Sequence, residues 1–200
     1  METQSSVAEL LRENESLRRE IAKLEDLRAL TYRDPLTGLW NRRYFAERLG
    51  AELSRARRTS GRNFTIVILD VNDFHRINDQ HGPTEGDLVL RWVGEFLERS
   101  VRAHDVCCRI GADTFGVILP DLNRTTAPLL LERLRAKTTS ATSRAPFLIA
   151  LSFGTATFPE DGATFDALLR VAEDARYLDK SRRPPTPAPE VTPNPARRVT

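Results

Sequence analysis

Arg109-Ile-Gly-Ala-Asp-Thr-Phe115 lies between two short apolar runs, residues 105–108 and 115–119. Because Gly-Ala-Asp-Thr can turn the chain back on itself, this stretch predicts a β-hairpin with the carboxylate of Asp113 at its tip. A tight hairpin with an acidic tip can bring a metal ion and a phosphate close to the backbone. The tip is therefore the first candidate for a functional site.

A third run, residues 64–69, is almost continuously apolar and β-branched. That pattern is typical of a strand buried on both faces of a sheet. The run ends in Asp70, and a carboxylate at the exit of a buried strand is costly unless something pairs with it. Two interpretations stay open: Asp70 is a metal ligand, or it is the N-cap of the next helix.

The segments around these strands alternate between helical and extended patterns. Asn41 and Thr164 are expected to cap helices, and Thr126 a third one. Residues 84–87, Thr-Glu-Gly-Asp, resemble a capping box in front of a long helix, and alternation over residues 147–155 predicts another strand. This mixture predicts an α/β (α+β) sandwich, in which a central, mostly antiparallel sheet is flanked by helices.

The two ends of the chain differ from its centre. In residues 1–30, apolar residues recur at heptad spacing and Asn14 occupies an a position, which favours a parallel, two-stranded coiled coil. The alternative is an amphipathic helix packed on its own domain. Residues 184–200 are rich in proline and are predicted to be disordered. The folded domain is therefore expected to span residues 31–183.

Composition excludes several classes of protein. The formal net charge is +2, so electrostatics gives no general case for binding DNA. No signal peptide and no apolar run of membrane-spanning length is present, so no membrane insertion is expected. The two cysteines, Cys107 and Cys108, are adjacent, which disfavours a mutual disulfide and suits a reducing cytoplasm.

Together these motifs resemble the GGDEF family of diguanylate cyclase domains. Residues 34–39 and 109–115 are similar to its opening and signature motifs, and residues 151–154 and 172–180 to its Ser-Ile-Gly strand and closing helix. The resemblance implies a palm-like nucleotidyl cyclase fold. It also implies a reaction in which a homodimer joins two GTP molecules, with Mg²⁺ or Mn²⁺, into cyclic di-GMP and pyrophosphate.

The resemblance assigns roles to individual residues. Asp70 and Asp113 correspond to metal ligands of the family. Asn78 and Asp87 correspond to the residues that hydrogen-bond guanine, although Asp87 is also explained as a helix-capping residue. Lys180 corresponds to a lysine that reaches the terminal phosphates.

A second site is implied by Arg102-Ala-His-Asp105, which matches the family's RxxD product-inhibition motif. Arg102 can offer a bidentate fork to a guanine edge or a phosphate, and Asp105 can accept a guanine N–H. The simpler interpretation is a local, exposed ion pair of little energetic consequence.

The departures from the family are concentrated where the chemistry occurs. In the remnant signature, Gly111 is kept, but Ala112 replaces the second glycine and Thr114 replaces the glutamate. Asn72 replaces an aspartate, and His75 replaces a lysine that neutralises phosphate charge. Threonine is neutral at pH 7 and histidine is mostly so, which argues against efficient turnover.

Three hypotheses follow. The preferred one is a degenerate GGDEF domain that binds cyclic di-GMP or GTP as an effector, with a coiled coil and a tail that transmit the signal to a protein partner. The second is a weakly active diguanylate cyclase, which would require Mg²⁺ or Mn²⁺ with its GTP. The third is a dimeric scaffold that binds no nucleotide.

Overall fold

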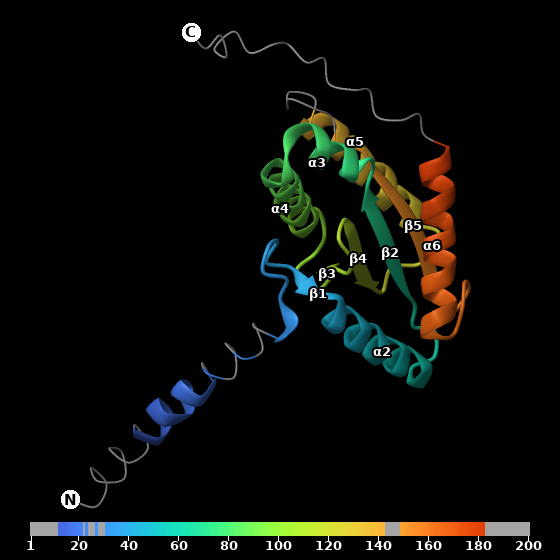
Figure 1. The fold of residues 1–200 in the computed structure, drawn as a ribbon. Coiled ribbons are helices and arrows are strands. Elements are labelled where there is room, and N and C mark those ends of the chain that lie inside the picture. Colours follow the sequence, from blue (N-terminus) through green and yellow to red (C-terminus); the bar gives the residue numbers. More distant parts are fainter. Residues whose placement is uncertain (1–11, 22, 24–26, 28–30, 143–148, 183–200) are drawn as a thin grey trace, which may run out of the picture.

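A five-stranded sheet forms the centre of the structure (Figure 1). The structure is a computed structural model, and it describes residues 12–21, 23, 27, 31–142 and 149–182. The strands are β1 (Trp40–Asn41), β2 (Phe64–Val71), β3 (Val106–Arg109), β4 (Thr114–Pro120) and β5 (Leu151–Phe158). They lie in the order β1-β3-β4-β2-β5, and neighbouring strands are antiparallel except for β1 and β3. The predicted sandwich with a mostly antiparallel sheet is confirmed.

Helices cover both faces of this sheet. They are α2 (Arg42–Arg58), α3 (Phe74–His81), α4 (Pro83–Ser100), α5 (Ala127–Thr142) and α6 (Phe165–Ser181). Ile66 and Ile68 of β2 pack in one core with α2 and α6, and Val67 and Leu69 pack in a second core with α4 and α5. All eight residues of β2 are buried, as its continuous apolar run predicts.

The ends of the helices confirm two capping predictions and correct two others. Asn41 accepts a hydrogen bond from the Tyr44 N–H, and Thr164 accepts one from the Ala167 N–H. The capping box predicted at residues 84–87 is wrong, because α4 already begins at Pro83, whose ring fixes a φ that suits a first turn. The N-cap interpretation of Asp70 is also wrong, because Asp70 lies within β2 and α3 begins only at Phe74.

The last strand begins later than predicted, and most of the two chain ends lies outside the described residues. The strand expected at residues 147–155 is instead Leu151–Phe158, because β5 pairs with the full length of β2. Residues 12–21 are helical, but most of the heptad pattern and the proline-rich tail lie outside the described residues, so the coiled coil stays a prediction. No helix in the described part of the chain is long and apolar enough to cross a membrane.

Candidate functional site

Asp70 lies where β2, β4 and β5 come together at one end of the sheet. Asp70 pairs with Thr114 on β4 and with Ser152 on β5, and only 6 % of its surface is exposed. The backbone carbonyl of Asp113 accepts a hydrogen bond of 3.2 Å from the Val71 N–H, which fixes the hairpin tip beside the end of β2. The structure therefore brings the two predicted metal ligands, Asp70 and Asp113, to the same place.

Two cations from α6 reach the same aspartate. The Arg176 guanidinium forms an ion pair with Asp70 Oδ2, and Lys180 Nζ lies 4.0 Å from that oxygen. Gly154 on β5 makes this approach possible: a Cβ there would lie 1.9 Å from the Ala172 carbonyl oxygen and 2.3 Å from the Arg176 nitrogen. Because Gly154 has no side chain, α6 packs directly on β5 and its arginine reaches across to β2.

Burial makes the Asp70 carboxyl harder to ionise than it is in water. Removal from water raises the pKa of Asp70 above its ordinary value, and the nearby charge of Asp113 raises it further. The Thr114 side chain, Arg176 and Lys180 act in the opposite direction without outweighing burial. The two cations therefore favour the ionised form of Asp70, and burial disfavours it.

The donor set does not fit a divalent metal. Within the described residues, no three His, Cys, Asp or Glu side chains gather where they could hold a metal ion. Asp70 Oδ1 is buried without a hydrogen-bond partner, but it is one oxygen where Mg²⁺ takes about six. The Asp70 carboxylate is already paired with Arg176 and approached by Lys180. The expected metal site is thus present only in part.

The predicted guanine-binding residues lie on adjacent helices. Asn78 of α3 packs against α4 at Gly86, where a Cβ would lie only 1.8 Å from Asn78 Oδ1. That oxygen is buried without a hydrogen-bond partner. Asp87 is the next residue of α4 and is half-buried. His75, in contrast, has a side chain that is 92 % exposed and lies 3.4 Å from Asp79, so the fold does not direct it toward Asp70.

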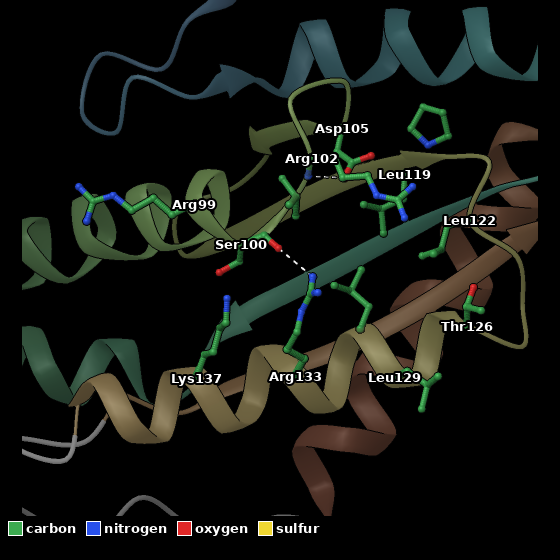
Figure 2. Close-up of a pocket in the computed structure, with 13 residues that line it drawn as sticks. Arg99, Ser100, Arg102, Asp105, Leu119, Leu122, Thr126, Leu129, Arg133 and Lys137 are labelled. Atoms are coloured by element: carbon green, nitrogen blue, oxygen red, sulfur yellow. Dashed lines mark hydrogen bonds between the residues drawn. The ribbon is translucent and has the colours of Figure 1, made fainter.

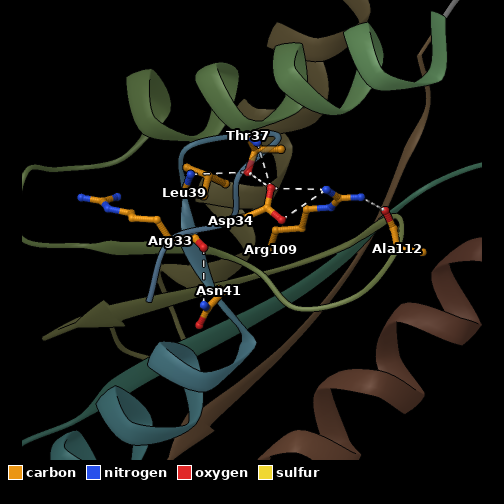
Figure 3. A network of polar contacts seen from close by, with 7 residues as sticks. All are labelled: Arg33, Asp34, Thr37, Leu39, Asn41, Arg109 and Ala112. Atoms are coloured by element: carbon orange, nitrogen blue, oxygen red, sulfur yellow. Dashed lines mark hydrogen bonds and ion pairs between the residues drawn. The ribbon is translucent and has the colours of Figure 1, made fainter. Parts of the chain in front are cut away.

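The frame of the hairpin is held by Arg109 (Figure 3). Its Nη1 donates to both carboxylate oxygens of Asp34 at 3.3 Å, and its Nη2 donates to the Ala112 carbonyl at 2.6 Å. Asp34 also accepts hydrogen bonds from the Thr37 N–H and hydroxyl. Burial would raise the pKa of Asp34, but the Thr37 hydrogen bonds and Arg109 outweigh it, so the pKa is lowered. The opening motif and the signature therefore form one unit.

A pocket of about 560 Å³ lies near the other end of β4 (Figure 2). Its lining comes from the end of α4, the turn before β3, the end of β4 and α5. Its charged lining residues are Arg99, Arg102, Asp105, Arg133 and Lys137. The structure thus brings the predicted pair Arg102 and Asp105 into one cavity with further cations.

Within the pocket, hydrogen bonds position two of these residues. Asp105 Oδ2 accepts the backbone N–H of Arg102 at 2.8 Å, and Arg133 Nη2 donates to the Ser100 carbonyl at 3.0 Å. The ion pairs of the described residues give Arg102, Arg133 and Lys137 no carboxylate partner. The Arg102 guanidinium is thus not engaged by Asp105, and the local ion-pair interpretation is wrong. Such a cavity suits a ligand with phosphate groups.

Sequence reasoning missed Arg176, Arg133 and Lys137. Arg176 had a signal that went unused, because Leu168, Ala172, Arg176 and Lys180 are four residues apart and share one helix face. The buried members of that series, Leu168 and Ala172, point into the core. Arg133 and Lys137 show the same spacing on α5, but only the fold brings them to Arg102.

The family profile that matches this chain and several of its curated relatives carry the name diguanylate cyclase. The sequence profile described as "Diguanylate cyclase, GGDEF domain" matches residues 31–184. The diguanylate cyclase DgcP of Pseudomonas aeruginosa is 36 % identical over 160 residues, which is 78 % of this chain and 24 % of DgcP. The chain spans about a quarter to a third of the length of the first curated relatives that it matches.

Solved structures of similar fold include complexes. The coiled coil and GGDEF domain of DgcB from Caulobacter crescentus, in complex with c-di-GMP, has a TM-score of 0.73 at 26 % identity, covering 87 % of this chain and 93 % of that one. The diguanylate cyclase SiaD from Pseudomonas aeruginosa, in complex with its activator SiaC, has a TM-score of 0.73 at 28 % identity, covering 90 % of this chain and 70 % of that one.

Proposed function

Because the chain belongs to the GGDEF family of diguanylate cyclase domains, we propose that it is a degenerate member that binds cyclic di-GMP and lacks efficient cyclase activity. One observation carries the proposal: Arg102 and Asp105 line a pocket of about 560 Å³ together with Arg133 and Lys137. The ligand has two phosphates and two guanines. Guanidinium groups can bind the phosphates or the acceptor edge of a guanine, and the carboxylate can accept a guanine N–H.

Features at the other end of the sheet argue against turnover. Phosphoryl transfer depends chiefly on positioning and on charge neutralisation by metal ions. Thr114 lies opposite Asp70 where the family has a glutamate, so the site lacks one carboxylate. With Arg176 paired to Asp70, the remaining donors do not suit the Mg²⁺ or Mn²⁺ that bound GTP would bring.

Calorimetric titration with cyclic di-GMP tests the proposal. We expect saturable binding to the full chain and a loss of about tenfold to a hundredfold in affinity for Arg102→Ala, because a charge-assisted hydrogen-bonding group is removed. Arg170→Ala is the matched control, since Arg170 is an exposed arginine outside the pocket. Absence of heat with the full chain, or equal binding by Arg102→Ala, would contradict the proposal.

A weakly active cyclase is the second candidate. The observation that favours it is Asn78, whose buried Oδ1 has no hydrogen-bond partner and lies beside the turn of α4 that carries Asp87. An unpaired buried amide oxygen is costly, and a rotation of the Asn78 side chain that presents it to a bound base would satisfy it. Binding of GTP that is lost in Asn78→Ala would support a retained nucleotide site. Formation of cyclic di-GMP would distinguish this candidate from an effector that only binds GTP.

We also propose that the chain forms a homodimer through a coiled coil at its N-terminal helix. In the helical residues 12–21, the side chains of Leu17 and Ile21 are 52 % and 53 % exposed, so this apolar edge is available to a second copy. A parallel coiled coil would place two domains side by side and give a protein partner a surface to act on. Replacing Asn14 by Leu should change the oligomeric order or register, measured by analytical ultracentrifugation. Monomers in both forms would contradict the dimer.

A further inference from the structure

Arg176 occupies the position where a metal ion would be expected. Its guanidinium contacts Oδ2 of Asp70, the oxygen that Lys180 also approaches at 4.0 Å. The Asp70 side chain is 9 % exposed and that of Arg176 is 21 % exposed, so the pair is largely shielded from water. Shielding strengthens the attraction and makes the loss of either partner costly.

The placement of Arg176 is built into the packing of α6. Ala172 and Leu168, one and two turns earlier on the same face, are fully buried in the core below Asp70. The close contact of α6 with Gly154 leaves the helix little freedom to withdraw. Arg176 is therefore a fixed part of the site, unlike an exposed arginine that can swing into solvent.

The charged side chains around Asp70 balance one another without a metal ion. Asp70 and Asp113 contribute two negative charges, and Arg176 and Lys180 contribute two positive ones, so the cluster is neutral without any ion. A divalent cation would have to enter a neutral cluster and displace a guanidinium from its carboxylate. Without Arg176, the same cluster would carry a net negative charge and would attract such a cation.

We propose that Arg176 is a built-in cation that takes the place of a divalent metal at Asp70, so that this end of the sheet excludes Mg²⁺ and Mn²⁺. The inference rests on the proposed function only in that both assume inefficient cyclase chemistry, since the pocket at Arg102 plays no part in it.

Titration of the full chain with Mn²⁺, followed by the electron paramagnetic resonance signal of free Mn²⁺, tests the proposal. We expect no saturable Mn²⁺ binding by the wild-type chain at Asp70. Arg176→Leu should bind Mn²⁺ at least about tenfold more tightly, because one positive charge beside the carboxylate has been removed. The double variant Arg176→Leu with Asp70→Asn should lose this binding again.

The control variant is Arg170→Leu, which removes an exposed arginine from the same helix and changes the net charge equally. It should bind Mn²⁺ as the wild type does. If Arg176→Leu does not fold, the wild-type chain alone still decides: Mn²⁺ should leave the amide NMR signals of Asp70 and Ser152 unbroadened. Broadening of those signals, or equal Mn²⁺ affinity of wild type and Arg176→Leu, would overturn the proposal.

Failure of this inference can be distinguished from failure of the proposed function. Cyclic di-GMP binding should be the same in the wild type and in Arg176→Leu, because the pocket lies at the other end of β4. A wild-type chain that binds both Mn²⁺ at Asp70 and cyclic di-GMP would overturn the inference alone. A chain that binds neither would overturn the proposed function alone.

Discussion

The two charged regions of this domain use their cations in opposite ways. At one end of β4, the carboxylate of Asp70 takes up Arg176 and approaches Lys180. At the other end, Arg102 and Arg133 line an open pocket, and the Asp105 carboxylate is held by a backbone N–H. The two regions are separated by about 20 Å, the length of a seven-residue strand, and face opposite sides of the sheet.

On the proposed assignment, the number of cations does not decide which region binds an anionic ligand. What matters is whether an internal carboxylate has already neutralised them. Arg176 is fixed by packing against β5, whereas Arg102 follows the end of α4 and is exposed. The first region therefore contributes mainly to folding stability, and the second is available for binding.

Replacing one arginine in each region by leucine should separate the contribution to stability from the contribution to binding. Arg176→Leu should lower the free energy of unfolding by about 3 kcal/mol, because Asp70 would remain buried with only Lys180 nearby. Arg102→Leu should change it by less than about 0.5 kcal/mol, as at an exposed site. Urea unfolding of both variants measures this, and equal losses would contradict the comparison.

Neutralising the carboxylate of the pocket should have the next largest effect. Asp105→Asn keeps an oxygen that can accept the Arg102 N–H, but it loses the charge that strengthens a hydrogen bond to guanine. We expect an affinity for cyclic di-GMP that is about tenfold lower, with little change in stability. Calorimetry and urea unfolding of the same preparation check both statements. Unchanged affinity would exclude Asp105 from the site.

The pH dependence of stability should report Asp34, which joins the opening motif to the hairpin. Its pKa is lowered in the folded state, so its contribution is present above the ordinary value of 3.8 and is lost as the pH falls through the folded pKa. Asp34→Asn should cost about 1 kcal/mol at pH 7 and should weaken the loss of stability in acid. Urea unfolding at several pH values below 6 measures this. An unchanged acid profile would contradict the role of Asp34.

The smallest effect is expected at Ala112. Outside glycine, the described residues with positive φ are Asp73 and Asp121, so the Cβ of Ala112 meets no strain from a left-handed backbone. Ala112 is also exposed. Ala112→Gly should therefore change stability by less than about 0.5 kcal/mol and should not create cyclase activity. Product formation by this variant would locate the defect at Ala112 instead of at Thr114 and Arg176.

Much of the fold was predictable because local signals and the family resemblance agreed. The buried run that forms β2, the glycine-led hairpin and the caps at Asn41 and Thr164 are set by short-range chemistry, and all were found. Arg176 was not found, because its partner Asp70 is 106 residues away in the chain. The four-residue spacing on α6 indicates which helix face carries Arg176, but only the packing of α6 on Gly154 brings Arg176 to Asp70.

The rate of cyclic di-GMP formation from GTP and Mn²⁺ by the full chain tests the division between the two regions most directly. We predict that a preparation which binds cyclic di-GMP through Arg102 forms no more product than its Asp70→Asn variant. Multiple turnovers by the wild-type chain that are abolished in Asp70→Asn would contradict this division, because they would show that Asp70 still serves catalysis despite Arg176.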